Sequence, residues 1–155
     1  MENACTFSPC RRYRYSLIHQ MRPGGRRLVW IGLNPSTADE QQLDPTLRRI
    51  RAFSLVWGFD EFVMLNLFAY RTKDPALMKA QADPVGPRND ATLLKHARAA
   101  ERVIAAWSRD GAHQGRAGHV QKLLAGRLEC LRRNADQSPA HPLYLPGTLR
   151  PIPFG

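Results

Sequence analysis

The chain has 155 residues, of which 43% are hydrophobic and 23% charged, a composition that indicates a single globular domain over residues 1–155 and excludes a disordered chain. Its 23 lysines and arginines outnumber 13 aspartates and glutamates, and this net charge of +10 favours nucleic acid or a nucleotide as partner. No apolar run approaches the ~20 residues that cross a bilayer, and the first residues lack a signal-peptide core. We therefore expect a cytoplasmic protein without membrane contact.

The first segment, residues 1–25, predicts an irregular or edge-strand lead-in, because aromatic and basic residues alternate over residues 12–15 before a Pro-Gly-Gly turn. An apolar run follows at residues 27–33 and stops abruptly in a polar, turn-prone cluster at residues 34–37. A short apolar run that ends in this way predicts a strand covered on both faces. Next, a helix is expected from Asp44-Pro45 to about Trp57.

The rest of the chain continues the alternation of strands and helices. Strands are expected at 61–67, 102–107 and 128–131, helices at about 88–100 and 115–124, and an ordered loop with a helical turn at 73–87. Such alternation predicts parallel strand pairing with helices on both faces. The expected fold class is α/β, with three α/β/α layers around a central, mostly parallel four-stranded sheet.

Residues typical of binding sites follow the carboxyl ends of the four expected strands, namely Asn34, Asn66, Trp107 and His141. Ligands of open α/β sheets bind beyond these strand ends, so four loops are expected to converge on one edge of the sheet. Two amides and an imidazole form a neutral set of donors and acceptors that suits the edge of a planar heterocycle. Alternatively, residues 34–37 form only a turn and a helix N-cap.

Aromatic and basic residues complete the expected site. The aromatic candidates for stacking on a heterocycle are Phe68, Tyr70 and Tyr144, and the candidates for contacting phosphate groups are Arg71, Arg109 and Arg116. The three cysteines, Cys5, Cys10 and Cys130, lack the spacing of a metal knuckle, and no glycine-rich phosphate loop occurs. We expect reduced thiols, no metal, no cofactor and no obligate protein partner.

Several runs of residues resemble the domain-of-unknown-function 1643 family over nearly the whole chain. They are Ile31 to Asp39, Asp44-Pro45-Thr46, Asn66 to Arg71, Asp83 to Asp90, and His141 to Leu145. This resemblance brings no established activity.

A more distant resemblance, to the uracil-DNA glycosylase superfamily, lies in the order of four short motifs. These are Gly32-Leu33-Asn34-Pro35, then Asn66 at the end of the second strand, then Trp107-Ser108, and finally His141-Pro142. In this comparison Ser108 stands in place of a glycine, and Asn34 in place of the aspartate of the uracil enzymes.

The glycosylase resemblance implies a uracil-DNA glycosylase-like fold and a DNA-repair hydrolase that cleaves the N-glycosidic bond of a damaged or deaminated base flipped out of DNA. It implies that His141 stabilises the departing base, that Asn66 reads the base edge and that Asn34 orients the attacking water. Asp39 or Asp44 would supply a carboxylate, although helix N-capping explains either residue as well.

The same resemblance assigns Gly32, Pro35 and Ser36 to the substrate pocket. It also implies that Leu143 or Tyr144 fills the gap that the flipped base leaves in the DNA base stack. DNA is then the expected partner. Two other interpretations of the sequence stay open. The chain is a non-catalytic or differently catalytic nucleotide-binding protein that uses the same pocket, or a nucleic-acid-binding module that acts through its basic surface.

Overall fold

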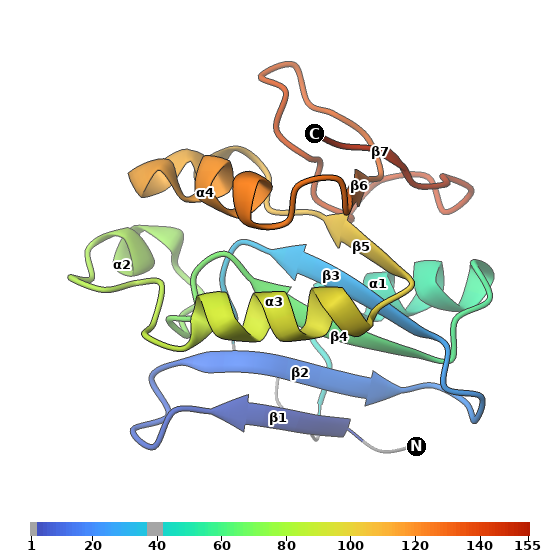
Figure 1. Cartoon of the computed structure of the whole chain (residues 1–155), viewed down its shortest axis with the longest axis horizontal. Coiled ribbons are helices and arrows are strands. Elements are labelled where there is room, and N and C mark those ends of the chain that lie inside the picture. Colours follow the sequence, from blue (N-terminus) through green and yellow to red (C-terminus); the bar gives the residue numbers. More distant parts are fainter. Residues whose placement is uncertain (1–2, 37–41) are drawn as a thin grey trace.

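A computed structural model describes residues 3–36 and 42–155, which form a mixed α/β fold around one seven-stranded sheet (Figure 1). The strands are β1 (Asn3–Phe7), β2 (Arg14–Gln20), β3 (Arg27–Gly32), β4 (Glu61–Asn66), β5 (Arg102–Ala105), β6 (Leu128–Cys130) and β7 (Ile152–Pro153). The helices are α1 (Pro45–Val56), α2 (Pro75–Lys79), α3 (Asn89–Ala99) and α4 (Arg116–Leu123), with a 3₁₀ segment, η1, at Arg109–Gly115.

The sheet is larger and more mixed than expected. Its order is β1-β2-β4-β3-β5-β6-β7, and the four predicted strands, β4, β3, β5 and β6, are parallel neighbours in its middle. The pairings of β1 with β2, β2 with β4 and β6 with β7 are antiparallel. The expectation of four strands was therefore wrong, because both ends of the chain add strands to the edges of the parallel core.

The lead-in also differs from the prediction, since it forms two strands, of which β1 lies at the edge of the sheet and β2 does not. Strand β2 lies between β1 and β4 and is covered on both faces. Arg14 and Ser16, which alternate with the apolar residues, are consequently buried along with Tyr15 and Leu17. An alternating pattern normally marks a half-exposed strand, and this one was misleading because its polar residues Arg14 and Ser16 are buried as well.

Helix α1 begins where the sequence predicts. The Asp44 side chain caps its N-terminus by accepting a hydrogen bond from the Leu47 amide at 2.9 Å, and Pro45 occupies the first turn. Its apolar face, which includes Ile50 and Phe53, packs on one side of the sheet. There the indole of Trp30, from β3, stacks on that of Trp57 with ring centroids 5.5 Å apart.

The opposite face of the sheet is covered by α2, α3 and α4, through buried residues that include Met78, Leu93 and Val120. Figure 1 shows α3 and α4 in front of the sheet and α1 behind it, an arrangement of helix, sheet and helix layers. Among the described residues, no helix combines the length and apolarity needed to span a membrane.

The order of the parallel strands creates a crevice at one edge. After β3 the chain passes through α1 to β4 on one side, and after β4 it returns through α3 to β5 on the other side of β3. The segments that leave β3 and β5 therefore run to opposite faces of the sheet. In open α/β sheets, ligands bind at such a switch point, beyond the carboxyl ends of the strands.

Candidate functional site

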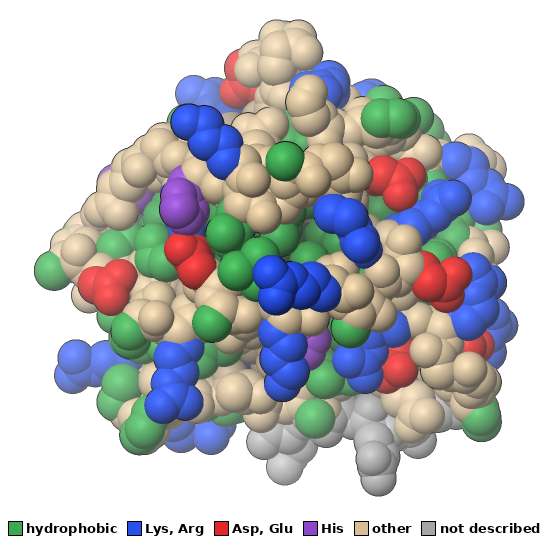
Figure 2. All heavy atoms as spheres, in the orientation of Figure 1, with side chains coloured by type: hydrophobic (Ala, Val, Ile, Leu, Met, Phe, Trp, Pro, Cys, Tyr) green, Lys and Arg blue, Asp and Glu red, His purple; other side chains and the backbone are tan. Residues whose placement is uncertain are grey.

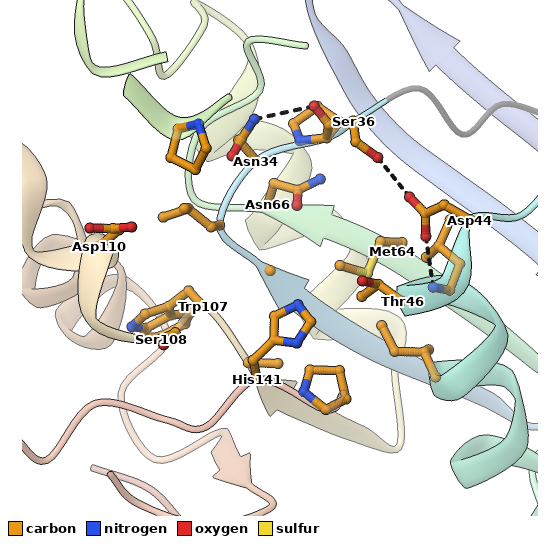
Figure 3. Close-up of a pocket in the computed structure, with 18 of the residues that line it drawn as sticks. Asn34, Ser36, Asp44, Thr46, Met64, Asn66, Trp107, Ser108, Asp110 and His141 are labelled. Carbon is orange, nitrogen blue, oxygen red and sulfur yellow. Dashed lines mark hydrogen bonds between the residues drawn. The ribbon is translucent and has the colours of Figure 1, made fainter. Parts of the chain in front are cut away.

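A cavity of about 350 Å³ lies at this switch point (Figure 3). It receives residues from the ends of β2, β3, β4 and β5, from the start of α1 and from the loop that contains His141. The convergence of four loops expected from the sequence is thus confirmed. The lining residues include Arg14, Gly32, Asn34, Pro35, Ser36, Asp44, Met64, Asn66, Trp107, Ser108, Asp110, His141 and Pro142.

Asn66, the last residue of β4, is only 2% exposed, and its Nδ2 has no hydrogen-bond partner among the described residues. Figure 3 shows its amide among the lining side chains, with the nitrogen directed toward the side of Ser36 and Asp44. An unpaired buried donor costs about 1–3 kcal/mol, so a ligand acceptor that met it would recover that free energy.

The neighbouring strand makes room for this amide by carrying a glycine. A Cβ on Gly32 would stand 2.6 Å from Cε of Met64 and 3.0 Å from Oδ1 of Asn66. A side chain at position 32 would therefore force the Met64 methyl to move and would crowd the Asn66 amide. The contribution of Gly32 to the site is therefore the space that its missing side chain leaves for the side chains of Met64 and Asn66.

The backbone that follows Asn66 is held from α3 and α4. The buried Asn89 side chain donates to the carbonyl oxygens of Asn66 and Leu67, both at 2.9 Å, and Nε of Arg116 donates to that of Leu67 at 2.7 Å. Arg116 is also paired with Asp90, through Nη1 at 2.6 Å. These bonds fix the end of β4, and with it the position of the Asn66 side chain.

Asn34 follows β3 and has its amide nitrogen committed to the protein. Nδ2 donates to the carbonyl oxygens of Pro35, Tyr70 and Thr72, at 3.2, 3.4 and 2.9 Å. Three carbonyl partners identify the nitrogen end of the amide, so Oδ1 is the atom through which Asn34 can accept a hydrogen bond from a ligand or a water. Asn34 can therefore stabilise the turn through its nitrogen and bind a ligand through its oxygen.

Ser36 and Asp44 form a pair at the start of α1. The Ser36 hydroxyl donates to Oδ2 of Asp44 at 2.6 Å, while Oδ1 accepts from the Leu47 amide (Figure 3). The helix cap therefore also places a carboxylate on the cavity wall. The other candidate carboxylate, Asp39, lies outside the described residues.

His141 projects into the cavity from the C-terminal loop (Figure 3). Its Nδ1 accepts a hydrogen bond from the Leu143 amide at 3.2 Å, so the neutral ring carries its proton on Nε2. Desolvation by the surrounding protein lowers the pKa of His141, and the negative charge of Asp44 opposes that shift. The ring is accessible to solvent but neutral at pH 7, and Nε2 is a donor.

Trp107 and Ser108 follow the end of β5 and lie at the cavity wall. The Trp107 ring is 2% exposed, and the Ser108 amide donates to the Pro139 carbonyl at 2.9 Å. Ser108 has φ 62° and ψ −166°, a region almost restricted to glycine. Ser108 therefore adopts a glycine-like backbone conformation.

The aromatic candidates lie outside the cavity. Phe68 is fully buried, with its ring 5.7 Å from that of His113, and Tyr70 packs edge-on against Tyr13. Tyr144 is 98% exposed. Phe68 is thus a core residue, Tyr70 is partly exposed, and Tyr144 is the most exposed of the three.

The basic candidates have different environments. Arg116 is 5% exposed and serves the network behind Asn66, whereas Arg109 is exposed beside a second hollow near Gln137. Arg71 donates through Nε to the Ser36 carbonyl at 3.3 Å. Leu143 is half-buried next to His141.

The sequence interpretation did not assign Arg14 to the site. Its side chain is 2% exposed and lines the cavity, because β2 runs antiparallel to β4 and begins where β4 ends. The feature of the sequence that could have identified Arg14 is its position as a charged residue at the start of a strand. Within residues 3–36 and 42–155, no group of three His, Cys, Asp or Glu side chains is placed to hold a metal ion.

A comparison with protein-family models matches residues 14–143, nearly the whole chain, to the family described as "Protein of unknown function (DUF1643)". The chain belongs to this DUF1643 family. Comparisons with curated proteins and with solved structures found no match. The DUF1643 match includes every cavity residue named above, from Arg14 to Pro142.

Proposed function

We propose that this protein is an N-glycosidic hydrolase that acts on a damaged or deaminated base flipped out of DNA, with a fold like that of the uracil-DNA glycosylases. The observation that carries this proposal is the buried, unpartnered Nδ2 of Asn66, in the same cavity as the neutral ring of His141. Hydrogen-bond donors at these positions suit the carbonyl-bearing edge of a nucleobase.

In this reaction the bond between the sugar C1′ and the base nitrogen breaks, and the electron pair leaves with the base. Nε2–H of His141 would stabilise the developing anion without transferring its proton, an electrostatic effect worth several kcal/mol. Asn66 would read the base, while Oδ1 of Asn34 would orient the water that attacks C1′. All three side chains line the same cavity.

The size and charge of the molecule support a nucleotide partner. A cavity of about 350 Å³ is near the lower limit for ligand pockets, and this favours one flipped nucleotide over a longer segment. The net charge of +10 favours association with the DNA backbone. On the face shown in Figure 2, Lys and Arg side chains are spread among Asp and Glu residues and form no single basic patch, so this argument depends on the net charge.

The test is a single-turnover assay with excess protein and oligonucleotides that carry uracil, hypoxanthine, xanthine or an alkylated base. Single- and double-stranded substrates are scored for abasic sites. We expect base release by the natural protein, and a loss of about 100-fold or more in the H141A variant. Variant H119Q is the matched control, because His119 is an exposed histidine of α4 outside the cavity lining and glutamine keeps a hydrogen-bond donor for Asp90.

A positive result also requires that H141A retain its affinity for DNA, since the proposed role is in the transition state. The absence of base release from every substrate would contradict the proposal. Binding of a free nucleotide that disappears in an N66L variant would then favour the nucleotide-binding alternative.

A further inference from the structure

One positive charge is fixed in the wall of the cavity. Arg14 is 2% exposed and, among the described lining residues, is the only lysine or arginine. Its guanidinium stays protonated at physiological pH and presents five N–H donors in a planar fork, enough to serve the protein and a ligand together. Any ligand in the cavity lies beside this charge, in surroundings where electrostatic interactions are stronger than in water.

An irregularity in β2 directs Arg14 into the cavity. In the pairing of β1 with β2, Leu17 lies opposite Cys5. Arg14 lies opposite Phe7, and Tyr15 falls between the paired positions. The two β1 residues are two positions apart and share a face, whereas a step of three positions on β2 would normally change face. The extra residue is a β-bulge, a feature that re-aims side chains next to binding sites, and it places Arg14 on the face of Leu17.

The bulge brings Arg14 to the same face of the sheet as Asn66. Leu17 pairs with Met64, and Met64 and Asn66 are two positions apart on β4, so all four side chains share this face. Strands β2 and β4 are neighbours, and neighbouring strands lie about 4.8 Å apart. Nδ2 of Asn66, shown inside the cavity in Figure 3, has no hydrogen-bond partner among the described residues. A fixed positive charge and an unpaired donor therefore mark the β2 end of the cavity.

These two groups suit a ligand that carries both an anion and a neutral acceptor. Arginine binds phosphate groups through two parallel N–H···O bonds, each about twice as strong as a hydrogen bond between neutral groups. A carbonyl group of a nucleobase suits the single donor of Asn66, as in the proposed function. A nucleotide has both groups, whereas a nucleoside or a free base lacks the anion. The cavity volume of about 350 Å³ leaves room for one such molecule.

We propose that Arg14 binds a phosphate group of a nucleotide inside the cavity, next to the base that Asn66 contacts. Two sources have this chemistry. One is a flipped nucleotide of DNA, which carries its own phosphates, and the other is a free nucleoside monophosphate. The DNA source rests on the proposed function, whereas the phosphate site itself needs binding and no reaction.

The carboxylates of the cavity oppose an anion to different extents. Asp110 is paired with Lys79, whose Nζ lies 2.8 Å from its Oδ1, so its charge is largely compensated. Asp44 accepts hydrogen bonds from a hydroxyl and a backbone amide, which are neutral donors. Removing the charge of Asp44 should therefore strengthen the binding of a phosphate group, and removing that of Arg14 should weaken it.

Calorimetric titration with nucleosides and their 5′-monophosphates tests the site. The ligands carry uracil, hypoxanthine or xanthine. We expect the natural protein to bind at least one monophosphate about 10-fold or more tightly than its nucleoside. In R14Q this preference for the monophosphate should fall to about twofold or less, because glutamine keeps N–H donors but carries no charge. In D44N the preference should rise, since asparagine caps helices as well as aspartate does but does not repel the phosphate.

Variant R102Q is the matched control. Arg102 begins β5 as Arg14 begins β2, and its loss lowers the net charge by the same amount, but it does not line the cavity. We expect R102Q to keep the natural preference and R14K, which has a charge without the planar fork, to show an intermediate one. Thermal unfolding verifies that each variant is folded, and D44N still measures the anion if substitution of Arg14 prevents folding.

Three results would overturn the proposal. They are a preference for the monophosphate that survives in R14Q, an unchanged preference in D44N, and equal or no binding of every nucleoside and monophosphate by the natural protein.

A second set of ligands distinguishes the two sources of the phosphate. Oligonucleotides that contain a damaged base carry a neutral methylphosphonate in place of the phosphate on the 5′ or the 3′ side of that base. If DNA is the source, one of these changes should weaken binding to the natural protein but not to R14Q. Equal binding of both, together with a preference for the monophosphate, identifies the free nucleotide. That preference without base release from any oligonucleotide would support the phosphate site and contradict the proposed function.

Discussion

At the scale of single residues, Ser108 carries the least favourable backbone of the described cavity lining. Its φ of 62° with ψ of −166° costs about 1–3 kcal/mol for a residue with a side chain, and such strain concentrates at functional sites. The turn holds Trp107 against the cavity and leads the chain into η1. The surrounding structure must therefore stabilise a geometry that Ser108 itself opposes.

Replacing Ser108 by glycine should relieve this strain. We expect S108G to raise the free energy of unfolding by about 1 kcal/mol, after allowance for the greater freedom of glycine in the unfolded chain. Chemical denaturation of S108G and the natural protein measures the difference. An S108A variant should gain nothing, because alanine keeps the Cβ. A lower stability for S108G would show that the Ser108 side chain contributes more than its backbone costs.

At the scale of elements, the first turn of α3 supports the end of β4. Asn89 is fully buried and satisfies two carbonyl groups, so removing its amide leaves both without that donor. The variant N89A should lose about 2–4 kcal/mol of stability, from the lost hydrogen bonds and the cavity together. Denaturation midpoints give the value.

The control is T92A on the same helix, where the Thr92 hydroxyl donates, among the described residues, only to the carbonyl of Arg88. We expect its stability to change by about 0.5 kcal/mol or less. A similar loss in both variants would show that Asn89 contributes only to the helix. It would contradict the role of Asn89 in fixing β4.

The sequence predicted those helices and strands whose patterns lie within their own residues. The apolar runs of β3 and β4 and the Asp44-Pro45 start of α1 carry their own patterns, and each lies where expected. The interior position of β2 was not predictable, because it depends on pairing with β4 across 40 residues of chain. Strand β7 has only two residues, Ile152 and Pro153, and no periodic pattern.

The part of the candidate site that could be predicted consists of residues that lie at or after the ends of strands. Asn34, Asn66 and His141 meet because parallel strands bring their carboxyl ends to one edge. Phe68 was expected to stack on a ligand, but the direction of its ring depends on how the chain turns after β4. That turn is set by tertiary contacts with α3 and α4.

At the scale of the whole molecule, three histidines make stability depend on pH. Desolvation lowers the pKa values of His19, His96 and His141, and neighbouring positive charges add to this effect at His19 and His96. As the pH falls below 6.5, the unfolded chain binds protons before the folded chain does. The free energy of unfolding should therefore decrease from about pH 7 to pH 5.

Urea denaturation at several pH values checks this expectation. The variant H96Q should weaken the dependence on pH, because it removes one of the three groups that bind protons preferentially in the unfolded chain. A constant or rising stability over this interval would contradict the assignment of neutral histidines to the folded protein.

The cavity draws on almost the full length of the chain, from Arg14 in β2 to Pro142 after β6. During synthesis, the residues that form its walls therefore leave the ribosome one after another, and His141 and Pro142 follow all the other lining residues. Because contacts between distant segments form late, a nascent chain can hold the early strands but not a complete pocket. The proposed chemistry thus becomes available only after synthesis has passed Pro142, and shorter products would lack a complete pocket.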